Sequence, residues 1–247
     1  EPIEQAVSGR DLMLAVDLSR SMEAQDFMLN KRPVDRLTAI KAIANEFIGR
    51  RVGDRIGLVL FGSQAYLQAP LTFDRKTVQI LLNEAVLGLA GENTAIGDAI
   101  GLAVKRLKNQ PAKSHVLILL TDGANTAGEV SPLKAAELAA SSGLKIYTIG
   151  IGADEMIVPS LFGSRKVNPS VDLDENTLIK IAESTGGYYY RARNTQELDN
   201  IYKRLDELEP VEKDKQYFRP RTELYTYPLA ASLLLIAVLC GFKLRHS

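Results

Sequence analysis

The sequence predicts an α/β fold in which a mostly parallel central sheet is covered by helices on both faces. Its apolar segments are short and largely uninterrupted, which is typical of strands buried on both sides. These segments alternate along the chain with segments of helical periodicity. The chain has 247 residues, of which 46% are hydrophobic and 24% charged, so it has enough apolar content for one sizeable core.

The expected strands are apolar runs, and the second and third are separated by the turn residues Gly62-Ser63. In chain order they are Asp11–Val16, Arg55–Phe61, Ala65–Ala69, His115–Thr121, Lys145–Ile151 and Tyr188–Ala192. The expected helices are Arg36–Arg50, Asp74–Leu87, Ala95–Lys108, Pro132–Ser142, Glu175–Thr185 and Thr195–Leu208. Pro132 suits a first turn, Gly186-Gly187 end the fifth helix, and Thr195 is expected to be the N-cap of the last.

The C-terminal part of the chain predicts a membrane anchor. The run 224–244 contains no acidic residue and no basic residue before Lys243, and as a helix it would span roughly 31 Å. A buried core helix is the alternative, but so long an apolar run leaves no polar face for water. We therefore divide the chain into a lead-in at 1–9, a folded domain at 10–208, a juxtamembrane linker at 209–223, a transmembrane helix at 224–244 and a tail at 245–247.

Composition excludes several classes of function. Thirty Lys and Arg residues balance thirty Asp and Glu residues, so nothing indicates binding to nucleic acid. The single cysteine, Cys240, excludes a disulfide within the chain, and the two histidines, His115 and His246, are too few for a zinc cluster. We expect His115 to be a core or edge residue. Because residue 1 is Glu1 and not methionine, we also expect a processed or shortened start.

Oxygen-bearing side chains gather where two of the predicted strands end. Asp17, Ser19 and Ser21 follow the first strand, Asp122 follows the strand "HVLILLT", and Thr94 lies in the loop "GENTAIGDAIG". In a parallel sheet the carboxyl ends of the strands form the site, so these residues are expected to meet. Carboxylate and hydroxyl oxygens are ligands for Mg²⁺, with Mn²⁺ possible, and too few protein ligands are present to close the coordination shell.

These five positions resemble the metal-ion-dependent adhesion site of von Willebrand factor A (VWA) domains. The resemblance covers Arg10 to about Leu208 and implies a Rossmann-like, non-enzymatic domain that binds Mg²⁺ and engages a protein partner through that partner's Asp or Glu. The segments "AVDLSRSMEAQDF", "LLTDGANTAG" and "STGGYYYRARNTQELDNIYKRLDELE" further resemble the bacterial aerotolerance (Bat) proteins. That likeness implies a bacterial inner-membrane protein with a periplasmic VWA domain, acting with other Bat-type proteins and a MoxR-type AAA+ ATPase in stress tolerance or envelope protein assembly.

Two other functions are open to the same residues. An aspartate after an apolar strand also begins Mg-dependent phosphohydrolases of aspartyl-phosphate type, but the second acid of their Asp-x-Asp motif is Ser19 here. A purely structural domain, whose metal only holds loops together, is the other alternative. Asp98 is expected to be a first-turn helix charge, with a supporting hydrogen bond to the site as the alternative, and Asp26 to be a solvated loop charge.

Charge around the predicted span does not decide its orientation. Lys243, Arg245 and His246 lie at the C-terminal end of the predicted span or just after it, and they argue for a cytoplasmic C-terminus. Four basic residues precede it and argue the other way: Lys213, Lys215, Arg219 and Arg221. The periplasmic position therefore rests on the resemblance to Bat proteins.

Overall fold

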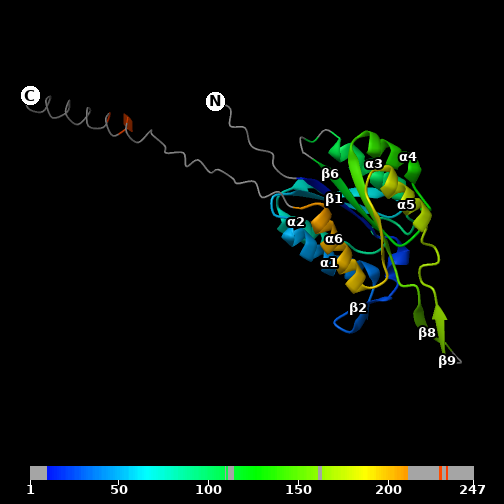
Figure 1. Ribbon diagram of the computed structural model, residues 1–247. Helices are drawn as coiled ribbons and strands as arrows, with labels where there is room; N and C mark the ends of the chain where they lie inside the picture. Colours follow the sequence, from blue (N-terminus) through cyan, green and yellow to red (C-terminus); the bar gives the residue numbers. More distant parts are fainter. Residues whose placement is uncertain are drawn as a thin grey trace, which may run out of the picture. The chain divides into compact units, whose positions relative to one another are not determined.

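The computed structural model describes residues 10–108, 110, 114–160, 163–210, 228–229 and 232. Six strands form one sheet in the spatial order β10-β7-β6-β1-β4-β5 (Figure 1). Their bounds are β1 Asp11–Asp17, β4 Arg55–Phe61, β5 Ala65–Thr72, β6 His115–Thr121, β7 Leu144–Ile151 and β10 Tyr189–Ala192. Neighbouring strands run parallel except β5, which pairs antiparallel with β4 at one edge. The predicted, mostly parallel sheet is confirmed.

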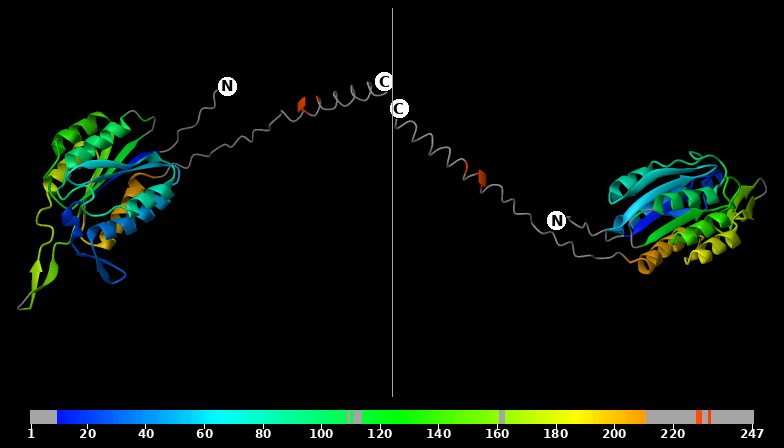
Figure 2. Two further views of the ribbon diagram at one scale, coloured as in Figure 1. Left: turned by 180° about the vertical axis from the view of Figure 1, so that it is seen from behind. Right: turned by 90° about the horizontal axis from the view of Figure 1, so that it is seen from above.

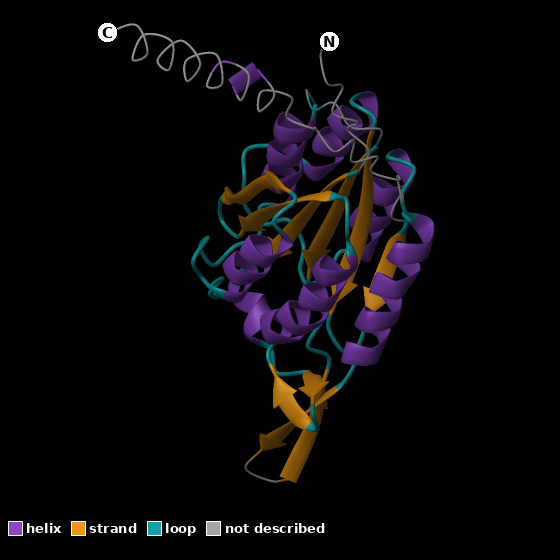
Figure 3. Ribbon diagram, turned by 90° about the vertical axis from the view of Figure 1, so that its left-hand side faces the viewer, coloured by secondary structure: helices purple, strands orange, loops and turns teal. Residues whose placement is uncertain are grey.

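Six helices cover the two faces of the sheet (Figures 2 and 3). They are α1 Arg36–Arg50, α2 Arg75–Asn83, α3 Ile96–Leu107, α4 Pro132–Ser141, α5 Glu175–Ser184 and α6 Thr195–Leu208. Helices α1, α2 and α6 pack on one face, and α3, α4 and α5 on the other. Along β1, Leu12 and Leu14 join the first core while Met13 and Ala15 join the second. Burial on both faces explains why this strand is apolar at every position from Leu12 to Val16.

Asp and Asn side chains cap the starts of four helices. In three of them a carboxylate accepts the backbone N–H of a threonine three residues later, in the pairs Asp35–Thr38, Asp74–Thr77 and Asp174–Thr177. For α6 the expected N-cap Thr195 is wrong: Asn194 caps the helix by accepting the N–H of Glu197 at 2.9 Å. The hydroxyl of Thr195 instead donates to the carbonyl of Met28 at 2.6 Å, a tertiary contact that local sequence does not encode.

Several boundaries differ from the predicted ones. Helix α2 ends at Asn83 and not at Leu87, because the chain turns toward β1, where the N–H of Gly88 donates to the carbonyl of Leu18 at 2.8 Å. Strand β5 continues to Thr72, past the predicted end at Ala69. It contains Pro70, which an edge strand tolerates because one side of it is unpaired.

Two antiparallel hairpins interrupt the alternation of strands and helices. A short 3-10 helix, η1 Arg20–Glu23, leads into the first hairpin, which pairs β2 Phe27–Leu29 with β3 Arg32–Val34. The second hairpin pairs β8 Met156–Ser160 with β9 Gly163–Val167 and stands away from the sheet in Figure 1. The first hairpin lies in a segment that was expected to be a loop, and neither hairpin has a run long or periodic enough to predict a strand.

The two ends of the described domain are joined to each other beside the start of β1. Arg10 donates from Nη1 to the carbonyl of Pro210 at 2.5 Å, and its Nε lies 3.3 Å from the carboxylate of Glu209. Arg51 donates to the carbonyl of Glu209 at 2.7 Å. Lys145 and Tyr147 both donate to the Glu209 carboxylate at 2.8 Å. Contacts within the domain therefore extend to Pro210.

The predicted lead-in, the linker beyond Pro210 and the tail lie outside the described residues. So does the predicted span at 224–244, apart from 228–229 and 232. In the part of the chain that the structure describes, no helix is both long and apolar enough to cross a membrane.

Candidate metal centre

The sheet topology brings the ends of β1 and β6 together. From β1 the chain moves to β4 on one side, and it later returns to the other side of β1 with β6. Strand order therefore reverses between β1 and β6, and such a reversal opens a crevice at the carboxyl ends of the strands. Asp17 is the last residue of β1, and Asp122 directly follows the last residue of β6.

Four of the five predicted residues form a continuous hydrogen-bonded row across this crevice. A carboxylate oxygen of Asp17 accepts the backbone N–H of Ser19 at 2.8 Å. The hydroxyls of Ser19 and Ser21 lie 3.0 Å apart, and Ser21 donates to Oδ1 of Asp122 at 2.5 Å. The second oxygen of Asp17 accepts the hydroxyl of Thr121 at 2.6 Å. The structure therefore places two carboxylates and two serine hydroxyls together.

Thr94 reaches the same place from the loop before α3. A methyl group added to Gly123 would lie 3.8 Å from Oγ1 of Thr94 and 3.9 Å from Oγ of Ser21, so the two hydroxyls flank one point. The backbone of Thr94 is fixed by Thr126, whose hydroxyl accepts the Thr94 N–H at 3.0 Å and whose N–H donates back at 2.9 Å. All five residues therefore converge.

The centre is buried except on one side. Asp17, Ser19, Thr94 and Asp122 are each at most 4% exposed, whereas Ser21 is exposed to solvent. A ligand from solution would therefore approach the centre beside Ser21.

Burial perturbs both acids of the centre. Burial, reinforced by the charge of Asp122, raises the pKa of Asp17 to about 7, although hydrogen bonds from Thr121 and Ser19 lower it. Burial also raises the pKa of Asp122, while the positive charge of Arg36 opposes that rise. Two neighbouring carboxylates withdrawn from water repel each other when both are charged, and a bound cation would relieve that repulsion.

The residues present fit a hard divalent cation. They offer carboxylate and hydroxyl oxygens, the ligands that Mg²⁺ and Mn²⁺ prefer, and they contain no thiolate or imidazole. Among the residues that the structure describes, no three His, Cys, Asp or Glu side chains gather so that they could hold a metal, so a cation at this centre would depend on two carboxylates and on hydroxyl oxygens. His115 lies at the opposite end of the sheet, where its Nδ1 is 3.5 Å from Asp11.

Sequence reasoning missed two residues of the centre, Arg36 and Asp26. Arg36 donates to Oδ2 of Asp122 at 2.6 Å and to the carboxylate of Asp26 at 2.5 Å. The expectation that Asp26 is a solvated loop charge is wrong, because its side chain is fully buried in this ion pair. Burial alone would lower the pKa of Arg36, but Asp26 and Asp122 together raise it. Arg36 occupies an ordinary amphipathic helix in the sequence, so only its position in the first helical turn could have signalled a special role.

Asp98 supports the loop that follows Asp122. Its carboxylate accepts the backbone N–H groups of Glu129 at 3.0 Å and of Val130 at 2.9 Å. Asp98 is therefore not only the expected first-turn charge, because it also fixes the loop that follows Asp122. It makes no direct hydrogen bond to the five predicted site residues.

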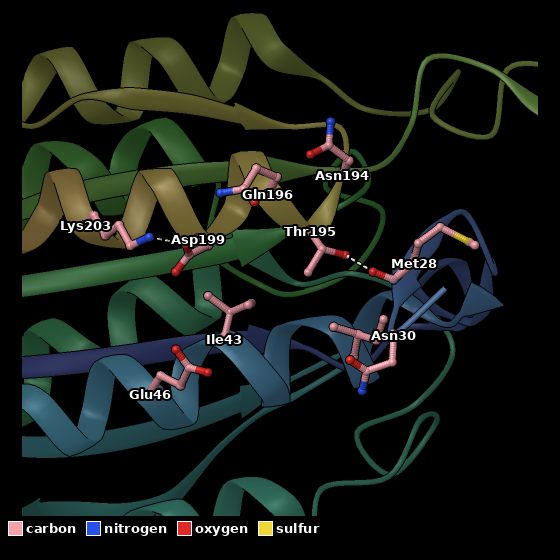
Figure 4. A pocket seen from close by; sticks show the side chains of 10 residues that line it. Met28, Asn30, Ile43, Glu46, Asn194, Thr195, Gln196, Asp199 and Lys203 are labelled. Atoms are coloured by element: carbon pink, nitrogen blue, oxygen red, sulfur yellow. Dashed lines mark hydrogen bonds and ion pairs between the residues drawn. The ribbon is translucent and has the colours of Figure 1, made fainter. Parts of the chain in front are cut away.

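A groove of about 530 Å³ lies away from the metal centre, between the β2–β3 hairpin, α1 and α6 (Figure 4). Its lining mixes apolar Met28 and Ile43 with the charged pair Asp199 and Lys203. None of the five predicted site residues lines it.

A doubly covered, mostly parallel sheet with two acids and three hydroxyls at its switch point defines the class of α/β domains that carry metal-ion-dependent adhesion sites. The family model for the von Willebrand factor type A domain matches residues 11–204. The chain belongs to this family.

Solved structures of two Bacteroides proteins are similar to this chain. BatB from Bacteroides thetaiotaomicron is 26% identical, with a TM-score of 0.66, and the match covers 81% of this chain and 98% of that one. An aerotolerance-related membrane protein from Bacteroides fragilis is 27% identical, with the same TM-score and the same coverage of both chains.

Two further proteins are similar to this chain, one at lower sequence identity and one that is longer than the chain. Proximal thread matrix protein 1 from the mussel byssus, solved with a zinc-occupied MIDAS motif, is 22% identical with a TM-score of 0.62, over 81% of this chain and 46% of that one, and shares the fold. An uncharacterised protein of Borreliella burgdorferi is 27% identical over 235 residues, which are 94% of this chain and 68% of that protein. The chain thus spans about two thirds of this relative.

Proposed function

We propose that this chain is a non-enzymatic binding module that holds Mg²⁺ and uses it to bind an acidic side chain of a protein partner. The ligand residues are Asp17, Ser19, Ser21, Thr94 and Asp122. Mn²⁺ is an alternative ion of similar preference. When bound, the cation supplies an electrophilic centre that favours an anionic oxygen over water.

One observation carries this proposal: the row of hydrogen-bonded oxygens from Asp17 to Asp122 passes through an exposed residue, Ser21, which opens the otherwise buried centre to solvent. A centre that served only to hold loops together would gain nothing from an open side. The mussel protein with a zinc-occupied MIDAS supports a divalent ion at such a site. The preference for Mg²⁺ rests on the oxygen ligands.

The wider proposal concerns the membrane and the complex. We infer a bacterial inner-membrane protein, anchored by 224–244, with its VWA domain in the periplasm. Other Bat-type proteins and a MoxR-type AAA+ ATPase are the proposed partners, in stress tolerance or envelope protein assembly. Support comes from the likeness to BatB and to a protein described as an aerotolerance-related membrane protein. Protease added to intact spheroplasts should digest the domain, and full protection until lysis would place it in the cytoplasm.

Thermal unfolding tests the metal. A ligand that binds only the folded state at about 100 times its Kd stabilises it by about 2.7 kcal/mol. For a domain of this size that is a rise in Tm of about 5–10 °C. Asp17→Ala should abolish the response, whereas Asp172→Ala, at an exposed aspartate, should retain it. An unchanged response in Asp17→Ala would show that the ion binds elsewhere.

Partner capture separates the proposal from its two alternatives. Proteins captured from membranes in Mg²⁺ should be lost in EDTA and with Thr94→Ala, but not with Lys180→Ala on the exposed side of α5. Equal capture under all conditions would favour a structural metal. Steady hydrolysis of an aryl phosphate in Mg²⁺, lost on Asp17→Ala, would favour the phosphohydrolase.

A further inference from the structure

The guanidinium of Arg36 connects three separate segments of the chain. It donates to Asp26 in the loop after η1, and to Asp122 at the end of β6 at 2.6 Å. It also donates to the carbonyl of Pro169 at 3.1 Å and to the hydroxyl of Ser170 at 3.3 Å, both just after the β8–β9 hairpin. The Arg36 side chain is 1% exposed, so these contacts replace water completely.

This position is unfavourable for a cation unless its partners are present. Arg36 is the first residue of α1, where the helix dipole disfavours positive charge. Burial adds a desolvation cost, which Asp26 and Asp122 offset as fully buried counter-charges. Loss of any one partner therefore strains the remaining contacts, so the three segments are held as one unit.

The base of the β8–β9 hairpin closes around this guanidinium. Asp26 accepts the N–H of Ala153 at 2.9 Å, three residues before β8 begins. Ser170 donates from its hydroxyl to the carbonyl of Ala153 at 2.9 Å, which closes the base from the other side. A methyl group on Gly152, whose φ is +134°, would lie 2.6 Å from Nη2 of Arg36. The backbone of Gly152 is therefore packed directly against the guanidinium of Arg36.

Asp122 divides its two oxygens between the metal centre and this cluster. Its Oδ1 accepts from Ser21 in the centre, and its Oδ2 accepts from Arg36. Arg36 therefore fixes the rotation of the carboxylate that faces the centre. The neighbouring Asp26 balances the charge of Arg36, so a cation held in the centre would not face an unpaired positive charge.

We propose that Arg36 is a positioning residue for the metal centre and couples it to the β8–β9 hairpin, so that metal binding and a fixed hairpin base favour each other. This inference rests on the proposed metal-binding function. The hairpin projects from the sheet in Figure 1, so the coupling would link the metal centre to the base of a projecting element.

Hydrogen exchange on the full chain in detergent tests the coupling, with Mg²⁺ itself as the probe. Mg²⁺ should slow exchange of the Ala153 amide at least about fivefold relative to EDTA, the lower end of ordinary coupling between sites. Because coupling is reciprocal, Ser170→Ala should weaken Mg²⁺ affinity, measured by calorimetry, by up to the same factor. Arg36→Lys, which keeps the charge and loses the fork of donors, should do the same.

The matched control is Ser184→Ala, which removes a serine hydroxyl that donates to the carbonyl of Ile181 within α5. It should change neither Mg²⁺ affinity nor Ala153 exchange. If Mg²⁺ binds but Ala153 exchange is unchanged, or if Ser170→Ala binds Mg²⁺ like wild type, the coupling is wrong while the proposed function stands.

Absence of any Mg²⁺ binding in wild type would instead overturn the proposed function, and with it the coupling to the metal. In that case, the connection from Asp122 through Arg36 to the hairpin base is tested by measuring Ala153 exchange in EDTA, without metal. Asp122→Asn should speed Ala153 exchange because it weakens the hold on Arg36, and equal exchange would overturn the link as well.

Discussion

Gly97 in the first turn of α3 should not tolerate even one added methyl group. A Cβ at this position would overlap the carbonyl oxygen of Val130, and it would lie 2.7 Å from the Val130 carbonyl carbon and 3.0 Å from the nitrogen of Pro132. All three atoms belong to the backbone, so no side-chain rotation can relieve the contact. Gly97 therefore allows α3 to lie directly against the start of α4.

The size of the effect follows from two opposed contributions. Overpacking a buried site against rigid backbone costs about 1–3 kcal/mol, and occasionally more. Replacement of glycine by alanine inside a helix returns about 1 kcal/mol. Because the overlap is with a carbonyl, we take the upper end of the first range and expect Gly97→Ala to lower the free energy of unfolding by about 2 kcal/mol.

Gly101, one turn later in the same helix, is the matched control. A Cβ there would meet no atom within 4 Å, so Gly101→Ala should raise the free energy of unfolding by about 0.5–1 kcal/mol. Denaturant unfolding of both variants measures the difference, which should be about 3 kcal/mol. Equal midpoints for the two variants would refute the close approach of α3 and the Val130 backbone.

Three further predictions concern the centre, a buried acid and a helix cap. Thr94→Ala should weaken Mg²⁺ binding in calorimetry at least about tenfold, the lower end of what loss of a supporting metal contact costs; unchanged affinity would remove Thr94 from the ligands. Burial would raise the pKa of Glu209, but hydrogen bonds from Lys145 and Tyr147 hold it below 4.5. Because the pKa of Glu209 is lower in the folded state than in the unfolded state, its charged form stabilises the domain at pH values above the unfolded-state pKa. This stabilisation is lost as the pH falls through the folded-state pKa, so Glu209→Gln should make the fall of Tm below about pH 4.5 less steep. Asn194→Ala should cost about 1 kcal/mol in denaturant unfolding as a lost N-cap, and no loss would restore Thr195 as the cap.

The sheet and the convergence of the candidate ligand residues could be predicted because their signals are local. Strand β1 is buried on both faces, so its sequence is apolar without interruption from Leu12 to Val16, directly before Asp17. The acids and hydroxyls then stand where strands end, and parallel topology places such ends together. Chain order alone was therefore enough to bring Asp17, Thr94 and Asp122 to one place.

The remainder depends on contacts between distant segments. Asp26 is buried only because Arg36 and the N–H of Ala153 surround it, and these lie 10 and 127 residues away along the chain. Asn194 and Thr195 are both good capping residues, so sequence could not choose between them. The hydroxyl of Thr195 donates to the carbonyl of Met28 in the first hairpin, and Asn194 is the residue that caps the helix.

The contact between Arg10 and Pro210 determines how the domain responds to tension. The chain enters and leaves at the amino end of β1, and Asp17 lies about 20 Å further along that strand. A force that pulls the two flanking segments apart would therefore act first on the contacts of Arg10, Glu209 and Arg51, which connect the two ends of the domain. Tension between the two chain ends would therefore act on these contacts before it acts on the crevice between β1 and β6.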